Sequence, residues 1–326
     1  MDTSTDIVRH EARIDAGQVA GEGPFALATT AIVASDLLKS SNPVILVCWS
    51  GGSYGRSYWD LQPSGVTGYS AAEHWARQGY IVVAADQLGV GDSDRPSDGD
   101  AVRIADMAEA GAGLVASLNR LMVAGDLHPA LPALEQARFI GVGHSLGGSL
   151  VVTQQALHRS YDAIVNIGFT QGDKGAVEAP EGADTSDLEA LALAQVGAFF
   201  EGGSESYGLP TKVGSRAWLF GPGDDQRIVD EDIQTAVTWP RGPYAEALLP
   251  GQTAAYAAAV DAPTFLGFSE IDIPEFPRRE PGYFGSANDL TLFVLPDAAH
   301  CSNFSPRRVD LWDRITAWER SLARHS

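Results

Sequence analysis

The chain of 326 residues is 44% hydrophobic and 20% charged, a composition typical of a globular protein with a sizeable core. Its 42 acidic residues outnumber its 22 basic residues, which gives a formal net charge of −20 at pH 7. This balance argues against a nucleic-acid-binding protein, which needs basic patches, and against a surface that docks on anionic lipid. We find no apolar run of about 18 residues and no signal-peptide pattern, so we expect a soluble, cytoplasmic protein without membrane contact.

Strand and helix patterns alternate along the chain, which is typical of a parallel sheet with helices on its faces. Several of the strands are continuous apolar runs, as expected of strands that are buried on both sides. An amphipathic pattern near the C-terminus indicates a final helix. The predicted strands cover residues 9–20, 25–35, 44–49, 80–85, 138–143, 162–169, 263–268 and 290–295, and the predicted helices cover residues 70–78, 104–123, 147–158 and 306–323.

The alternation is interrupted between residues 172 and 260. This segment is rich in Gly, Pro and acidic residues and shows helical patterns only at residues 187–200 and 252–260. The simplest organisation is one α/β domain, residues 1–171 and 261–326, that is interrupted by an insertion of residues 172–260. We therefore expect a single continuous core and a smaller attached unit.

A nucleophile motif lies between a predicted strand and a predicted helix. The segment Gly143-His144-Ser145-Leu146-Gly147 matches the pattern G-x-S-x-G. In this context the serine occupies a sharp turn that exposes its hydroxyl, and the glycines remove side chains that would collide there. The helix begins directly after Ser145, so the N–H of Leu146 faces an oxyanion that forms at the serine. We therefore predict that Ser145 is the nucleophile and that Leu146 is an oxyanion donor.

A serine hydroxyl needs a base that takes its proton and an acid that orients the base. Among seven histidines, His300 follows the last predicted strand in a short loop at a sheet end, from which it can reach Ser145. The acid is expected in the loop after the penultimate strand, where the extra reach beyond the strand favours Asp272. Glu270 and Asp173 are the alternative acids.

These segments together resemble the α/β-hydrolase superfamily over about residues 40–170 and 260–323. The resemblance rests on the serine motif, the segment Asp86-Gln-Leu-Gly-Val-Gly-Asp-Ser93, the turn Ser269-Glu-Ile-Asp272, the pair Ala299-His300, and the chain order Ser, Asp, His. It implies an α/β fold with a mostly parallel, eight-stranded sheet flanked by helices, and a helical cap, residues 172–260, over the site. It also implies that Asp86 has a structural role.

The second oxyanion donor is expected in the loop that follows strand 44–49. Glycines there let the backbone approach a substrate with its N–H pointing inward. The family commonly has His-Gly before the donor residue, and this sequence does not. Counting from the strand start favours the N–H of Ser50, whereas counting by small residues favours the N–H of Gly51.

The complete Ser, Asp and His set predicts a serine carboxylic ester hydrolase that acts through an acyl-enzyme on a small to medium, largely apolar ester. A lactonase, an amidase or a cofactor-free perhydrolase needs the same triad, and a non-catalytic ligand-binding protein of this fold is a further alternative. No metal-site spacing and no nucleotide-binding fingerprint is present, so we expect neither a metal nor a cofactor. The oligomeric state is left open, and a homo-oligomer is compatible with the sequence.

The insertion provides two expectations about the substrate. Residues 173–232 contain 13 acidic and four basic residues, a net charge of −9 that we expect to steer anionic esters away. Apolar side chains of the insertion form either a pocket wall or its own small core: Leu191, Val196, Phe199, Phe200, Trp218, Trp239 and Tyr244. Outside the insertion, Cys48 and Cys301 are too few for a disulfide framework, and we expect free buried thiols.

Overall fold

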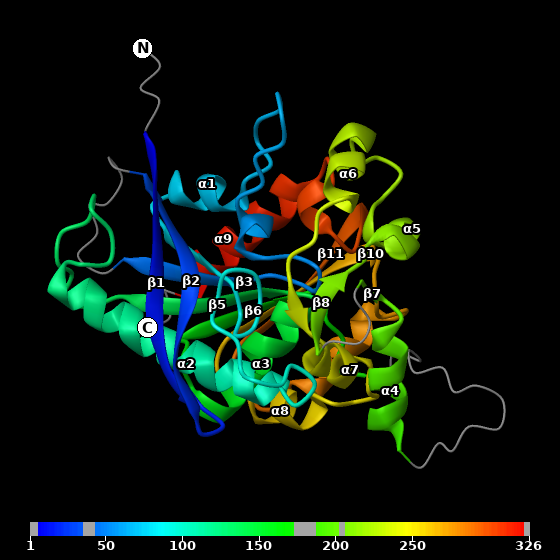
Figure 1. Cartoon of the computed structure of the whole chain (residues 1–326). Coiled ribbons are helices and arrows are strands. Elements are labelled where there is room, and N and C mark those ends of the chain that lie inside the picture. The colour runs from blue at the N-terminus through cyan, green and yellow to red at the C-terminus, as the bar shows by residue number, and fades with distance from the viewer. Residues whose placement is uncertain (1–5, 35–42, 173–186, 202–205, 323–326) are drawn as a thin grey trace.

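An eight-stranded sheet forms the centre of the computed structural model, which describes residues 6–34, 43–172, 187–201 and 206–322 (Figure 1). The strand order is β1-β2-β4-β3-β5-β6-β10-β11, in which β2 is antiparallel to β1 and β4 and all other neighbours are parallel. This confirms the predicted mostly parallel sheet. The strands are β1 (Ile7–Val19), β2 (Glu22–Ala34), β3 (Val44–Trp49), β4 (Ile81–Ala85), β5 (Arg138–His144), β6 (Ala163–Ile167), β10 (Thr264–Ile271) and β11 (Leu290–Ala299).

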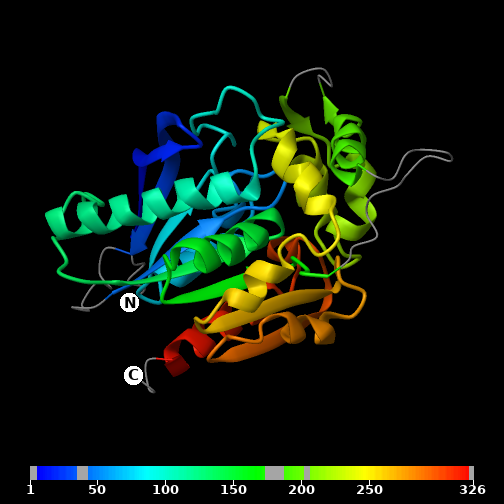
Figure 2. The ribbon, with the colours of Figure 1, turned by 90° about the horizontal axis from the view of Figure 1, so that it is seen from below.

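Helices cover both faces of this sheet. Along β3, Val47 and Trp49 belong to the core that contains residues of α2 and α3, whereas Leu46 and Cys48 belong to the core that contains residues of α1 and α9. Because side chains alternate between the two faces, a strand covered on both sides has to be apolar throughout. Figure 2 shows α2 and α3 side by side on one face. The helices are α1 (Ala71–Ala76), α2 (Ile104–Ala124), α3 (Leu146–His158) and α9 (Arg308–Leu322), with short 3₁₀ turns η1 (Arg56–Trp59), η3 (Pro277–Tyr283) and η4 (Ser302–Phe304).

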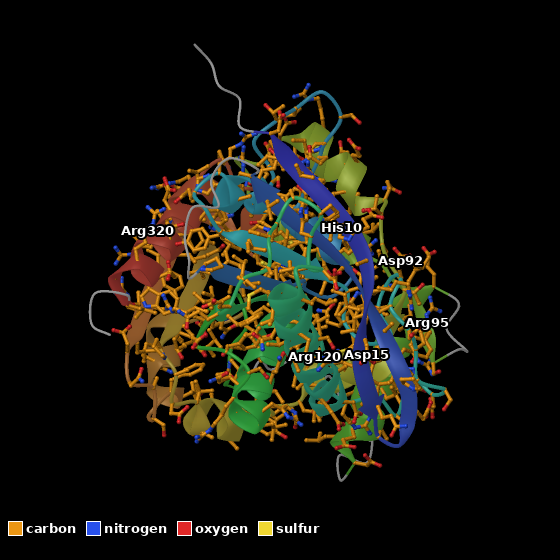
Figure 3. The ribbon with its side chains drawn as sticks, turned by 90° about the vertical axis from the view of Figure 1, so that its left-hand side faces the viewer. His10, Asp15, Asp92, Arg95, Arg120 and Arg320 are labelled. Atoms are coloured by element: carbon orange, nitrogen blue, oxygen red, sulfur yellow. The ribbon has the colours of Figure 1, made fainter. Side chains whose placement is uncertain are left out.

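The β1–β2 hairpin at one edge of the sheet is attached to α2. Ser117 Oγ donates to Asp15 O at 2.6 Å, and Arg120 Nη2 lies 3.7 Å from Asp15 Oδ2. Figure 3 shows Asp15 on β1 beside Arg120 on α2. A Cβ at Gly113 would lie 2.0 Å from Ala16 O, so a glycine is required where the helix backbone meets the strand. In the described part of the chain, no helix is both long and apolar enough to cross a membrane.

The chain between β6 and β10 forms short elements that gather at one end of the sheet (Figure 2). β7, β8 and β9 pair as a second, antiparallel sheet, and α8 packs against α3. The predicted helical stretches correspond to α4 and α8, which are rich in Ala. The other elements have two to eight residues, lack such a composition and show no clear periodicity, so they were not predicted. The elements are α4 (Leu188–Gly197), β7 (Phe200–Glu201), β8 (Tyr207–Pro210), η2 (Val213–Ser215), α5 (Arg216–Leu219), α6 (Gln226–Ile233), β9 (Trp239–Pro240), α7 (Arg241–Leu248) and α8 (Ala254–Ala259).

Candidate active site

Ser145 lies in a sharp turn between β5 and α3, with a backbone φ of 53° in the left-handed region. Its N–H donates to Ile167 O at 2.8 Å. Close approach of the backbone requires both glycines of the motif: a Cβ at Gly143 would lie 2.0 Å from Gly147 O, and a Cβ at Gly147 would lie 2.2 Å from Trp49 O. The turn therefore has the strained strand–turn–helix geometry of a nucleophile elbow.

Asp272 and His300 form a buried pair where the chain leaves β10 and β11. Asp272 Oδ1 lies 2.6 Å from His300 Nδ1, and the two side chains are 1% and 2% exposed. The Asp272 carboxylate also accepts the N–H groups of Ser269 and Ile273, each at 2.8 Å. A carboxylate at Nδ1 holds the imidazole in the tautomer that carries its proton there, which leaves Nε2 able to act as a base.

The structure brings the three predicted triad residues to one place. Ser145 and His300 line the same cavity, and Asp272 contacts His300 from behind. The alternative acid Glu270 is exposed, and its carboxylate accepts the N–H of Asp297 at 2.9 Å. The other alternative, Asp173, lies outside the described residues. The geometry at His300 therefore favours Asp272 over Glu270.

His144 supports the loop that carries His300. Its Nε2–H donates to His300 O at 2.9 Å, and its ring stacks on Tyr58 with ring centroids 4.7 Å apart. Burial, and to a lesser extent the neighbouring His300, holds the pKa of His144 well below its ordinary value, so the ring stays neutral. Sequence reasoning missed this contact, because residues 144 and 300 meet only through the order of the strands.

The loop after β3, residues 50–54, passes beside Ser145. Gly51 lines the cavity, and a Cβ built on it would lie 2.9 Å from Ser145 Cβ. Ser50 is fully buried and does not line the cavity. Its carbonyl oxygen accepts a hydrogen bond from Gln87 Nε2 at 2.6 Å. Leu146 also lines the cavity, and its N–H is in the first turn of α3, where helices leave such groups without intrahelical acceptors. Of the two candidates for the second donor, the geometry favours Gly51.

The cavity has a volume of about 300 Å³ and a mainly apolar wall. Four of the seven predicted wall residues line it, namely Val196, Phe199, Trp218 and Tyr244, whereas Leu191, Phe200 and Trp239 do not. The ring of Trp218 lies 4.9 Å from that of His300, between centroids. The remaining apolar lining comes from Phe169, Pro210, Leu219, Ala247, Leu248 and Ile273.

Lys212 is a lining residue that sequence reasoning missed. Its Nζ lies 2.9 Å from Asp232 Oδ2 and 4.1 Å from the centroid of the Tyr54 ring, and Tyr54 Oη donates to the same carboxylate oxygen at 2.8 Å. Burial lowers the pKa of Lys212 and raises the pKa of Asp232, while their mutual attraction opposes both shifts. A single lysine in a Gly- and Pro-containing segment carries no sequence signal of such a pair.

The two cysteines are buried as protonated thiols, and Asp86 braces a loop. Cys48 and Cys301 are buried free thiols, and burial raises the pKa of each, so both stay protonated. Asp86 accepts the N–H groups of Arg56 at 2.6 Å and of Asp92 at 3.2 Å, which places it in a loop-bracing role. Within the described ranges, no three His, Cys, Asp or Glu side chains form a group that could hold a metal ion.

Solved structures similar to this chain include hydrolases of low sequence identity. A thermophilic esterase from Thermogutta terrifontis is 17% identical with a TM-score of 0.65, over 96% of this chain and 98% of that chain. E-2-(Acetamidomethylene)succinate hydrolase is 19% identical with a TM-score of 0.56, over 95% and 98%. The monoacylglycerol lipase of Paleococcus ferrophilus is 17% identical with a TM-score of 0.58, over 90% and 97%. At these identities the similarity establishes the fold alone.

The family itself is established by sequence. No match was found among curated proteins. Residues 31–310, which are most of the chain and include Ser145, Asp272 and His300, match the alpha/beta hydrolase family. The chain therefore belongs to the alpha/beta hydrolase family, and its general activity is that of a hydrolase.

Proposed function

We propose that this protein is a serine carboxylic ester hydrolase. The observation that carries the proposal is the 2.6 Å contact between the buried Asp272 and His300, at the wall of the cavity that Ser145 lines. An oriented imidazole beside a serine on an elbow is the arrangement that acyl transfer needs. The apolar cavity supports an ester over a charged substrate.

In the proposed reaction, His300 Nε2 accepts the Ser145 proton while Ser145 Oγ forms a bond to the ester carbonyl carbon. The carbonyl oxygen becomes an oxyanion, which the N–H groups of Leu146 and Gly51 stabilise. The bond to the alcohol oxygen then breaks, and that oxygen takes the proton from His300. Water, deprotonated by the same imidazole, attacks the acyl-enzyme and releases the carboxylic acid and free Ser145.

The proposed substrate is a small to medium, neutral and largely apolar ester. The ten apolar and aromatic side chains named above line the cavity together with Leu146, and Lys212, which lines it as well, is paired with Asp232. The net charge of −9 over residues 173–232 supports the same choice, because a negative field repels anions that approach it. We expect the hydrolysis rate of an anionic ester to rise with added salt, and that of a neutral ester to stay constant. We also propose a cytoplasmic location, where free thiols persist.

Two measurements test the proposal: hydrolysis of p-nitrophenyl esters of increasing acyl length, and labelling by a fluorophosphonate. We expect wild-type hydrolysis and a single adduct on Ser145, and Ser145→Ala should lower kcat by about 10⁶-fold. Ser215→Ala is the matched control, because Ser215 also lines the cavity but lies outside the triad. Hydrolysis that survives in Ser145→Ala, or an adduct elsewhere, contradicts the mechanism. No hydrolysis and no adduct in the wild type would favour a ligand-binding protein.

A further inference from the structure

Ser53, in the loop that supplies the second oxyanion donor, has a backbone conformation that serine disfavours. Its φ is 70°, in the left-handed region where glycine is usual. The Tyr54 N–H donates to Gly51 O at 3.2 Å, so residues 51–54 form a tight turn with Ser53 in third position. A serine persists there only when its surroundings hold it.

Tyr244, on α7 of the insertion, contacts this turn from the cavity. Its hydroxyl lies 3.1 Å from Ser53 Oγ. Burial raises the pKa of Tyr244, and hydrogen bonds with the side chain and the backbone of Ser53 act against that rise. A Cβ on Gly52 would lie 2.3 Å from Tyr244 Oη and 3.1 Å from Leu146 Cδ1. Gly52 is therefore enclosed between Tyr244 and the residue that follows the nucleophile.

The Tyr244 ring is itself fixed within the insertion. It makes edge-to-face contacts with Phe200 at 5.1 Å and with Trp239 at 5.4 Å, between ring centroids. Burial raises the pKa of Tyr244, so its hydroxyl stays protonated. The hydroxyl is thus presented to the turn by a ring that packing holds in place.

Other residues of the insertion hold the same turn from its backbone side. Val237 N–H donates to Ser53 O at 3.3 Å, and Trp239 Nε1–H donates to Tyr54 O at 3.0 Å. The insertion therefore contacts both the main chain of the turn and the side chain of Ser53. The position of the oxyanion loop depends on residues nearly 200 positions later in the chain.

We infer that Tyr244 is a positioning residue for the oxyanion site. Its hydroxyl holds Ser53 in the left-handed conformation and thereby directs the N–H of Gly51 towards the carbonyl that Ser145 attacks. This inference rests on the proposed ester hydrolysis. Without the hydroxyl the turn relaxes, so the transition state loses stabilisation, whereas substrate binding by the apolar wall is kept.

Tyr244→Phe removes only the hydroxyl, and Tyr207→Phe is its matched control. Tyr207 is also in the insertion, its hydroxyl donates one hydrogen bond, to Pro96 O at 2.9 Å, and it does not line the cavity. Removal of a whole oxyanion donor costs on the order of 10²–10³ in kcat, so we expect Tyr244→Phe to lower kcat at least tenfold. KM should stay within twofold, and Tyr207→Phe should leave both constants unchanged. A kcat of Tyr244→Phe within twofold of wild type overturns the inference.

Substitution of Ser53 separates positioning from direct contact with substrate. Glycine adopts a φ of 70° without strain, so Ser53→Gly in the Tyr244→Phe background should recover several-fold of the lost kcat. Ser53→Ala in the same background keeps the strain and should recover none. If neither variant recovers activity, the hydroxyl acts on the substrate rather than on the turn, and the positioning role is wrong.

Hydrogen exchange gives a readout that needs no substrate. In Tyr244→Phe, a peptide that covers residues 50–58 should exchange at least tenfold faster than in wild type and in Tyr207→Phe. Unchanged exchange overturns the inference even if ester hydrolysis is confirmed. A wild type that neither hydrolyses esters nor labels at Ser145 contradicts the proposed function instead, and the exchange result still decides whether Tyr244 holds the turn.

Discussion

The Asp272 carboxylate lies 2.6 Å from His300 Nδ1 in a position that solvent does not reach. In Asp272→Asn an amide replaces the carboxylate, and its N–H donates to His300 Nδ1. The imidazole then carries its proton on Nε2 and cannot accept the proton of Ser145. We expect kcat to fall by about 10⁴-fold. The measurement is kcat with a p-nitrophenyl ester, and the control is Glu270→Gln, two residues away and exposed. Equal losses in both variants would show that Asp272 has no special role.

Gly147 determines the stability of the elbow, because a Cβ there would lie 2.2 Å from the carbonyl oxygen of Trp49. Gly147→Ala forces β3 and α3 apart, and we expect the free energy of unfolding to fall by about 1–3 kcal/mol or more. Urea unfolding measures the change. Gly214→Ala is the control, because a Cβ at Gly214 meets no atom within 4 Å and should change stability by less than about 0.5 kcal/mol.

The buried pair of Lys212 and Asp232 makes a prediction about charge. Lys212→Met leaves the Asp232 carboxylate buried without its partner, which should cost about 3–5 kcal/mol of unfolding free energy. Adding Asp232→Asn should restore most of that loss, because the amide oxygen still accepts the Tyr54 hydroxyl without a charge. Arg216→Met, which breaks the exposed pair with Asp230, should cost about 0–1 kcal/mol in the same urea titration. A double variant as unstable as Lys212→Met contradicts the argument.

His144 makes stability depend on pH. Because burial depresses its pKa in the folded state, the unfolded chain binds a proton that the folded chain excludes once the pH falls below about 6.5. Wild-type stability should therefore fall with acidification by up to about 1.4 kcal/mol per pH unit from this residue. In His144→Gln this contribution disappears, so its curve from pH 7.5 to 5 should be flatter. The pKa of His128 is also lowered by burial, and its contribution cancels between the two proteins. Parallel curves would contradict the prediction.

The sheet, and the place where Ser145, Asp272 and His300 lie together, could be predicted from sequence because their signals are local. A strand covered on both faces, such as residues 44–49, has to be a continuous apolar run, and the collision that excludes side chains at Gly143 and Gly147 appears as a short motif. His300 followed from its place after the last strand. Each of these signals is contained within a few residues of the feature it predicts.

The insertion could not be predicted in the same way. Elements such as β9, with two residues, and α6, with eight, are too short for a hydrophobic period, and tertiary packing decides their structure. The contacts of Tyr244 with Ser53 and of Lys212 with Tyr54 join segments more than 150 residues apart. Propensity and spacing hold no information about such pairs, and for the same reason the sequence leaves both Ser50 and Gly51 open as the second oxyanion donor.

The insertion leaves the sheet after β6 and returns at β10, and these two strands are parallel neighbours in which Ile164 pairs with Thr264. The segment between β6 and β10 can therefore be replaced by one of different length or sequence without a change in sheet register. Ser145 precedes the replaced segment in the chain, and Asp272 follows it. The cavity wall can therefore change there while Ser145, Asp272 and His300 keep their positions. A grafted segment, however, also has to make the contacts that fix residues 51–54. Chimeras of this protein should therefore fold more readily than they recover the wild-type turnover rate.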